Sequence, residues 1–194
     1  DVAVHVGTLF SVLLYFRKDV GQMIGGFFQT LRGNTQTEGA MLIQHVVMAS
    51  VPVILAGFFM HVYSPDWVRS VTVVAWTTLI FGIVLGLADT YLPAKRQLDQ
   101  MKLTDAIFIG LAQALALIPG TSRSGITMTA ARLSGFSRVE AARFSILLAI
   151  IAIGGAGALS MIELVYTENF DLGLNAVVAM VLAFLSGSSS ISSG

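Results

Sequence analysis

The sequence has 194 residues, of which 55% are hydrophobic and 11% charged, and its mean hydropathy is +0.81. A soluble domain carries about 25% charged residues, so this composition excludes a disordered chain, a basic nucleic-acid-binding domain and an ordinary cytosolic enzyme. Eleven basic residues balance eleven acidic ones, and the absence of cysteine excludes a disulfide framework, a thiol nucleophile and a thiolate metal site. The sequence predicts an all-α polytopic membrane protein.

Long apolar runs recur along the chain, and runs of about 18–20 residues are typical of membrane-spanning helices. They cover residues 1–16, 41–63, 68–92, 141–166 and 172–185. A further run, residues 106–118, is too short to span a bilayer at about 1.5 Å per residue, and Pro119-Gly120 ends it. The first run has neither a basic n-region nor a small-residue cleavage site, so we do not interpret it as a signal peptide.

Basic residues cluster in three of the connections between these runs, and such clusters mark cytoplasmic loops. They are Arg17, Lys18, Arg32, Lys95, Arg96, Lys102, Arg132, Arg138 and Arg143. The connection at residues 163–171 carries three acidic residues and no basic one. We therefore expect residues 17–39, 93–103 and 132–143 in the cytoplasm and residues 163–171 outside.

The expected location of residues 93–103 and 132–143 on the same side of the membrane constrains the path of the chain between them. If both clusters are cytoplasmic, the chain between them cannot cross the bilayer and must return to the side from which it entered. We therefore predict a re-entrant hairpin around residues 104–134, with its tip near residues 119–125. The short run and the Pro-Gly break predict the same hairpin independently.

The predicted tip reads Pro-Gly-Thr-Ser-Arg-Ser-Gly, a polar segment at membrane depth. Irregular backbone is tolerated there only where it is buried in protein or lines a watery cavity, and an intramembrane arginine indicates a functional site by default. A guanidinium offers phosphate a planar fork of donors, hydroxyls add neutral donors, and glycines let backbone N–H groups approach a ligand. The candidate residues are Gly120, Thr121, Ser122, Arg123, Ser124 and Gly125.

A helix restarting at Ile126 would point its positive end at the same spot. The tip is therefore predicted to bind a phosphate or carboxylate group, a chemistry that does not separate hydrolysis from transport. The alternative is that Arg123 snorkels to an interface or pairs with an acid, while the serines only cap the next helix.

Other polar residues are weaker candidates. Gln113, about two turns before the tip, could orient a phosphate or a metal-bound water, or equally bond a neighbouring helix. His5 is interpreted as a packing histidine, with proton transfer as the alternative. His45 and His61 are assigned to interfaces because their separation prevents a shared ligand, so a dedicated zinc site is not expected.

Two acidic residues lie on either side of the connection at residues 93–103. Asp89 and Asp105 are each expected to be solvated or to cap a helix, and Thr104-Asp105 is typical of a helix start.

Three motifs carry a resemblance to a known family. Residues 110–125, which read GLAQALALIPGTSRSG, are followed by GFSR at 135–138 and AARFS at 141–145. Together they resemble the second signature of the undecaprenyl-pyrophosphate phosphatase family of the bacitracin-resistance type. VHVGTL at residues 4–9 is similar to the helix after that family's first signature. The resemblance covers about residues 1–185.

The resemblance implies one integral membrane domain over residues 1–186, built from two inverted repeats at roughly 1–92 (incomplete) and 104–186. Each repeat would contain a re-entrant hairpin, and the two tips would meet in a cavity open to the outer face of the bacterial inner membrane. Residues 187–194 are expected to form a flexible Ser/Gly tail. The expected partners are the bilayer and a polyprenyl pyrophosphate lipid, with a homodimer as a further candidate and no nucleic acid.

The implied activity is hydrolysis of undecaprenyl pyrophosphate to undecaprenyl phosphate, which recycles the lipid carrier of cell-wall synthesis with a divalent cation, Mg or Ca. Arg123 would grip the pyrophosphate, with Ser122 and Thr121 in the same pocket. The family's first signature, with its glutamates, serine and histidine, is expected before Asp1. The alternatives are a polyprenyl-phosphate transporter or flippase and a non-catalytic lipid-phosphate binder.

Overall fold

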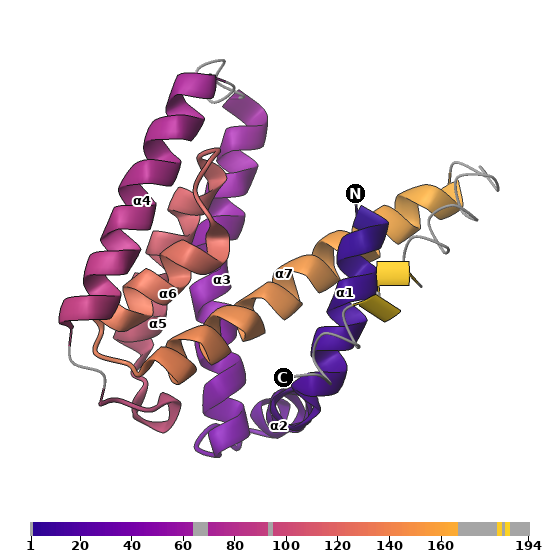
Figure 1. The fold of residues 1–194 in the computed structure, drawn as a ribbon. Helices are drawn as coiled ribbons and strands as arrows, with labels where there is room; N and C mark the ends of the chain where they lie inside the picture. The colour runs from indigo at the N-terminus through magenta and orange to yellow at the C-terminus, as the bar shows by residue number, and fades with distance from the viewer. Residues whose placement is uncertain (1, 64–69, 93–94, 167–181, 184, 187–194) are drawn as a thin grey trace. The chain divides into compact units, whose positions relative to one another are not determined.

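The protein is all-helical over the residues described by a computed structural model, apart from turns and one parallel β-bridge between Arg96 and Phe136. The described residues are 2–63, 70–92, 95–166, 182–183 and 185–186, without the side chains of 2–6, 61 and 156–166. In chain order the elements are α1 (Val2–Tyr15), α2 (Arg17–Leu31), α3 (Glu38–Tyr63), α4 (Val71–Tyr91), η2 (Leu98–Gln100), α5 (Leu103–Ala114), η3 (Leu115–Leu117), α6 (Arg123–Leu133) and α7 (Arg138–Tyr166) (Figure 1). The predicted run at residues 172–185 lies mostly, and the predicted tail at residues 187–194 wholly, outside the described residues.

The chain forms two compact units, each of which is described by itself. One unit comprises residues 1–22 and 149–194 and contains α1, the start of α2 and the second half of α7. The other comprises residues 23–148 and contains α3, α4, α5 and α6. Every residue of the predicted tip belongs to the second unit, so the candidate site is built within it.

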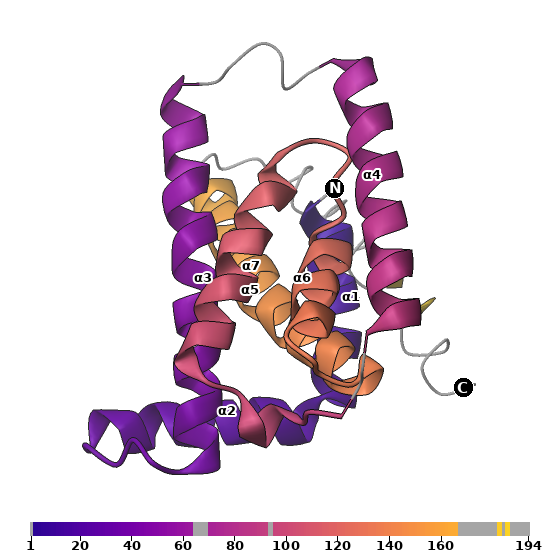
Figure 2. The ribbon, with the colours of Figure 1, turned by 90° about the vertical axis from the view of Figure 1, so that its left-hand side faces the viewer.

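In the second unit, α3 and α4 flank the shorter helices α5 and α6 (Figure 2). Residues 38–60 and 71–91 are long and apolar enough to cross a bilayer, which agrees with the second and third predicted runs. In their most apolar windows only 17% and 6% of the residues are buried, so these helices expose apolar side chains that suit contact with lipid.

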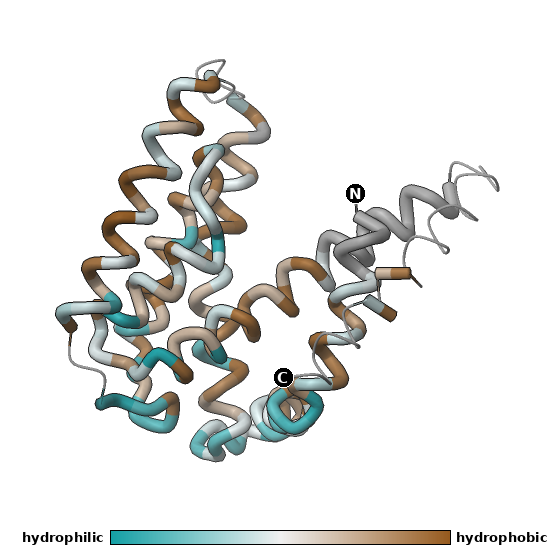
Figure 3. The backbone as a smooth tube through the Cα atoms, in the orientation of Figure 1, coloured by the Kyte–Doolittle hydropathy of each residue, from teal (hydrophilic) through white to brown (hydrophobic). Residues whose placement is uncertain are grey.

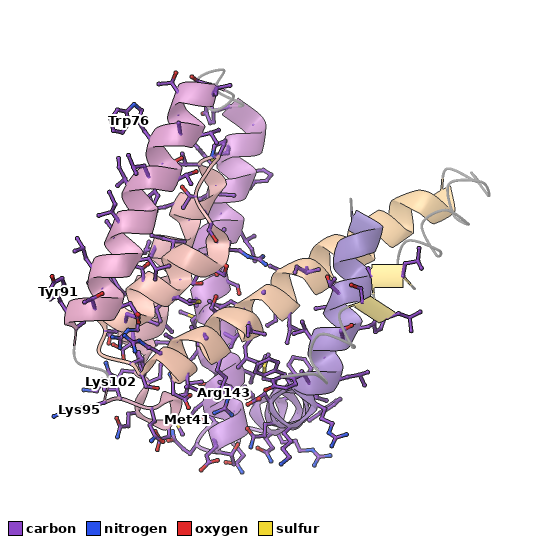
Figure 4. The ribbon with its side chains drawn as sticks, in the orientation of Figure 1. Met41, Trp76, Tyr91, Lys95, Lys102 and Arg143 are labelled. Carbon is purple, nitrogen blue, oxygen red and sulfur yellow. The ribbon has the colours of Figure 1, made fainter. Side chains whose placement is uncertain are left out.

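Hydropathy follows the ends of these helices. In Figure 3, α4 is mostly hydrophobic, whereas the segment between α4 and α5 is hydrophilic. Trp76 and Tyr91 project outward from α4, and Lys95 and Lys102 lie beyond its C-terminal end (Figure 4). Exposed Trp and Tyr with flanking lysines are typical of a helix that meets the membrane interface.

The chain reverses direction between α5 and α6 (Figure 2). These helices have 12 and 11 residues, which corresponds to about 18 and about 17 Å, too short for a hydrocarbon core of about 30 Å. α5 packs closely on α3, because a Cβ built on Gly110 would lie 2.5 Å from the carbonyl oxygen of Ala49. α6 packs on α4. The pair therefore forms a helical hairpin held between two longer helices.

The α3–α5 contact predicts that alanine at Gly110 lowers the melting temperature more than alanine at Gly82, a glycine in another apolar helix. Gly110→Ala should destabilise the protein by about 1–3 kcal/mol, because overpacking forces backbone apart, and should lower the melting temperature in detergent. Gly82→Ala is the matched control, since a Cβ there meets nothing within 4 Å among the described residues. Equal melting temperatures for the two variants would contradict the packing.

Candidate functional site

The tip of the hairpin is a tight turn. The N–H of Thr121 donates to the carbonyl oxygen of Ile118 at 3.1 Å, and Gly120 has φ +87°. That left-handed conformation favours glycine, because in other residues the Cβ would lie too close to the following carbonyl oxygen. The Pro-Gly break therefore reverses the chain within the predicted tip.

The helix after the turn begins earlier than the sequence analysis predicted. Ser122 is the N-cap of α6, and its Oγ accepts a hydrogen bond from the N–H of Gly125 at 3.2 Å. α6 therefore starts at Arg123, and the predicted restart at Ile126 is wrong by one turn. The physical reason is this cap, which satisfies a first-turn N–H and allows the helix to begin immediately after it.

Arg123 stands in the first turn of α6 and is half-buried. Among the described residues its guanidinium makes no hydrogen bond and no ion pair. The first N–H groups of a helix also have no acceptor within the helix, so positive potential gathers at this point. A pairing of Arg123 with an acid, the alternative considered from the sequence, does not occur within the described chain.

Three hydroxyls accompany this arginine. The Oγ atoms of Ser122 and Ser124, both exposed, lie 3.3 Å apart. Thr121 is 9% exposed, and its Oγ1 has no hydrogen-bond partner among the described residues. The structure thus brings the predicted tip residues together, and their functional roles stay predictions.

Gln113 lies in the last turns of α5 and is 1% exposed. Its Oε1 has no partner in the described part of the chain, and no described hydrogen bond joins it to the tip. The structure therefore leaves its predicted role at the site a prediction.

Two residues of α4 that the sequence analysis missed contact the tip. Thr77 Oγ1 donates to the carbonyl oxygen of Pro119 at 2.6 Å, and Thr78 Oγ1 donates to that of Gly120 at 2.9 Å. A Cβ on Gly120 would clash with Thr77 Oγ1 and with the carbonyl oxygen of Val74. The tip is therefore seated directly on α4. The only sequence signal was an adjacent pair of hydroxyl residues in an apolar run.

α7 supports the first turns of α6 with another hydroxyl. Thr127 Oγ1 and Ser145 Oγ lie 2.7 Å apart in a buried contact, and Ser145 Oγ lies 3.5 Å from the carbonyl oxygen of Ser124. Ser145 belongs to the AARFS motif at residues 141–145, so this part of the motif packs against the site.

Arg96 joins the two ends of the hairpin at its base. Its guanidinium donates to the Asp105 carboxylate at 2.6 and 3.2 Å and to the carbonyl oxygen of Ser134 at 2.7 Å. It also lies 4.4 Å from the ring centroid of Phe136, a cation–π contact. Because Asp105 belongs to α5 and Ser134 follows α6, this residue fixes where both helices meet the connecting segment.

Asp105 also caps its helix, which was one of the two roles expected of it. α5 begins at Leu103, and the Asp105 carboxylate accepts the N–H of Lys102 at 2.9 Å. Burial raises the pKa of this carboxyl, but the hydrogen bonds from Arg96 and from the Lys102 backbone and their charges outweigh burial and lower the pKa below its ordinary value. The same pair raises the pKa of the Arg96 guanidinium.

A second arginine cluster connects the ends of α4 and α6. The sequence analysis expected Asp89 to be solvated or to cap a helix, but its carboxylate lies 2.6 Å from Arg138 Nε and 3.4 Å from Arg132 Nε. Arg132, 3% exposed, also donates to the carbonyl oxygens of Leu92 and Phe136 at 3.0 and 2.7 Å. The Asp89 side chain is 39% exposed, which agrees with the expected contact with solvent, and its pairing with arginines of α6 and α7 was not predicted.

The described residues hold no group of three or more His, Asp or Glu side chains that could bind a metal ion. His45 is partly buried on α3, and the side chains of His5 and His61 lie outside the described residues. The described chain therefore presents anion-binding groups without a set of metal ligands.

Comparisons with a family profile and with individual known proteins indicate the same family. The profile of the family described as bacitracin resistance protein BacA matches residues 1–193. The chain is 46% identical to an undecaprenyl-diphosphatase of Saccharophagus degradans over 188 residues, which cover 95% of this chain and 71% of that protein. It is 46% identical to one of Dinoroseobacter shibae over 185 residues, covering 95% and 69%. It is also 45% identical to one of a Jannaschia species over 186 residues, covering 95% and 70%.

The Asp105–Arg96 pair predicts how stability changes with pH. Because the folded-state pKa of Asp105 is lowered, its contribution is complete above the ordinary carboxyl pKa of about 4 and is lost as the pH falls through the lower folded value. Asp105→Asn should therefore reduce the melting temperature at neutral pH and narrow its difference from the wild type in acid. Asp99→Asn, an exposed carboxylate nearby, is the control. A constant difference across pH would argue against the pair.

Proposed function

Because this chain belongs to the bacitracin resistance protein BacA family, we propose that it hydrolyses undecaprenyl pyrophosphate to undecaprenyl phosphate and inorganic phosphate. The observation that carries the proposal to particular residues is the half-buried Arg123 guanidinium, which has no partner within the described chain. A diphosphate is the kind of group that such a guanidinium binds in a bidentate manner.

The reaction breaks the P–O–P anhydride bond, and the oxygen of water ends on the released phosphate. Arg123 would hold the diphosphate and offset the charge that develops on its oxygens, which is the main demand of phosphoryl transfer on a protein. Ser122 would assist as a second catalytic group by donating its hydroxyl. Thr121, Ser124 and the backbone at Gly120 would bind further oxygens.

Activation of the nucleophile requires other groups. In the family that this sequence resembles, a serine and a histidine of the first signature are assigned to nucleophilic and acid–base work, and its glutamates to the metal. A divalent cation, Mg or Ca, is part of the same proposal. The described residues do not fit a metal site, because no three His, Asp or Glu side chains among them gather to bind the ion.

For the setting of the site, we propose that α5 and α6 form a re-entrant hairpin in the second of two inverted repeats, within a multi-pass protein of the bacterial inner membrane. The support is that both helices are too short to span and that Arg96 joins their base. Lys95 and Lys102 flank the same base, which suits a cytoplasmic position. The tip would then face a cavity open to the periplasm, and a homodimer is a further proposal.

Replacing the arginine tests the activity. Arg123→Ala should lower the rate of phosphate release from undecaprenyl pyrophosphate by at least about 10²–10³-fold, the usual effect of removing a donor from developing charge. Arg123→Lys should recover only part of the rate because an ammonium lacks the planar fork. The measurement is phosphate release by purified protein in detergent, with exposed Arg32→Ala as the control.

Retained turnover in Arg123→Ala would contradict the assigned role. Lipid-phosphate binding by the wild type without any phosphate release would instead favour the transporter or the non-catalytic binder.

The absence of cysteine makes the topology testable. In intact spheroplasts, a membrane-impermeant maleimide should label Ser122→Cys at the tip and should label Lys102→Cys at the hairpin base only after permeabilisation. Both positions are exposed, so the difference reports the side of the membrane and not burial. Labelling of Lys102→Cys in intact spheroplasts would contradict the proposed orientation of the hairpin in the membrane.

A further inference from the structure

We infer that Thr77 and Thr78 of α4 are positioning residues that set the backbone of the anion-binding tip, a role that rests on the proposed function. They are the residues of another helix that hydrogen-bond the turn between α5 and α6, at 2.6 Å to the carbonyl oxygen of Pro119 and 2.9 Å to that of Gly120. Neither residue belongs to the motifs that identify the family.

The two bonds determine which backbone groups the tip can offer. The peptide units here are trans, so the C=O and N–H of each unit point in opposite directions. With the Pro119 carbonyl turned to Thr77, the N–H of Gly120 points away from α4. The next N–H, that of Thr121, is used within the turn by the carbonyl of Ile118.

The same bonds remove two acceptors from the site. A carbonyl oxygen carries partial negative charge and would repel the oxygens of a diphosphate. Holding the carbonyls of Pro119 and Gly120 against α4 leaves the donor-rich side of the tip for the anion. The tip and α4 are in close contact, because a Cβ on Gly120 would clash with Thr77 Oγ1.

The two threonines differ in what else they bond. Thr77 Oγ1 also lies 2.8 Å from the carbonyl oxygen of Val73 and 3.1 Å from that of Val74 in its own helix. The described bond of Thr78 goes to Gly120 alone. Thr90, farther along α4, bonds only its own helix, at 2.7 Å to the carbonyl oxygen of Gly86, and provides a matched control.

The test compares Thr77→Val and Thr78→Val, singly and together, with the corresponding serine variants and with Thr90→Val. Valine keeps the shape and removes the hydroxyl, so folding of an apolar helix should survive, as a melting curve checks. We expect each valine variant to lower kcat/KM about tenfold, the usual scale of one hydrogen bond, and the double variant to lower it further. Binding of inorganic pyrophosphate should weaken in parallel. The serine variants and Thr90→Val should behave like the wild type.

A second measurement follows the tip without turnover. In the Ser122→Cys background, the maleimide labelling rate should rise several-fold when Thr78 is replaced by valine and should stay unchanged with Thr90→Val.

Valine variants that match the wild type in kcat/KM, pyrophosphate binding and labelling rate would overturn the inference, as would serine variants that lose as much as the valine variants. A wild-type protein that neither hydrolyses the lipid nor binds pyrophosphate would instead overturn the proposed function, and the inference with it.

Discussion

The break between α5 and α6 removes the helical partners of several backbone groups, and the site depends on how these groups are satisfied. A buried N–H or C=O without a partner costs about as much as a lost hydrogen bond. The carbonyls of Pro119 and Gly120 are satisfied by hydroxyls of α4, and the N–H of Thr121 is satisfied by Ile118. The groups left over at the start of α6 are therefore donors, which is the character that an anion requires.

The two ends of the hairpin differ in which backbone groups are satisfied by side chains. At the base, helices end in carbonyl groups, and arginines of the chain satisfy them: Arg132 donates to Leu92 at the end of α4, and Arg96 donates to Ser134 at the end of α6. Cations are favourable at helix C-termini. The tip gathers helix N-terminal donors and adds Arg123, so it concentrates positive potential. At the base, Asp89 and Asp105 pair with arginines, whereas at the tip no described acidic side chain pairs with Arg123.

The sequence predicted the parts of this arrangement that depend on local pattern. A Pro-Gly break and an arginine among hydroxyls inside apolar runs located the tip, and the short run with basic residues on both sides predicted that the chain returns. Capping by the serines was stated only as an alternative, and Ser122 does cap α6, so the helix starts one turn earlier than predicted. That cap was readable, since a serine before a helix commonly serves as one.

The contacts that the sequence could not predict are tertiary. A threonine in an apolar helix usually bonds its own helix, as Thr90 does. Nothing local distinguishes Thr90 from Thr77 or Thr78, which also have acceptors in the tip, 42 residues away. The same holds for Asp89, whose arginine partners belong to α6 and α7. Such pairs require knowledge of which helix ends meet.

The lack of a described carboxylate beside Arg123 is consistent with how phosphoryl transfer divides its tasks. A carboxylate paired with this guanidinium would have to be displaced by the substrate, and part of the binding energy would be lost in breaking that pair. A half-buried guanidinium without a partner is instead partly desolvated before a substrate arrives, so a diphosphate that binds there, as proposed, would gain the full interaction. Charge stabilisation and activation of a nucleophile are separate requirements. A hairpin tip without an acid or base can therefore be complete for the first requirement while another segment supplies the second.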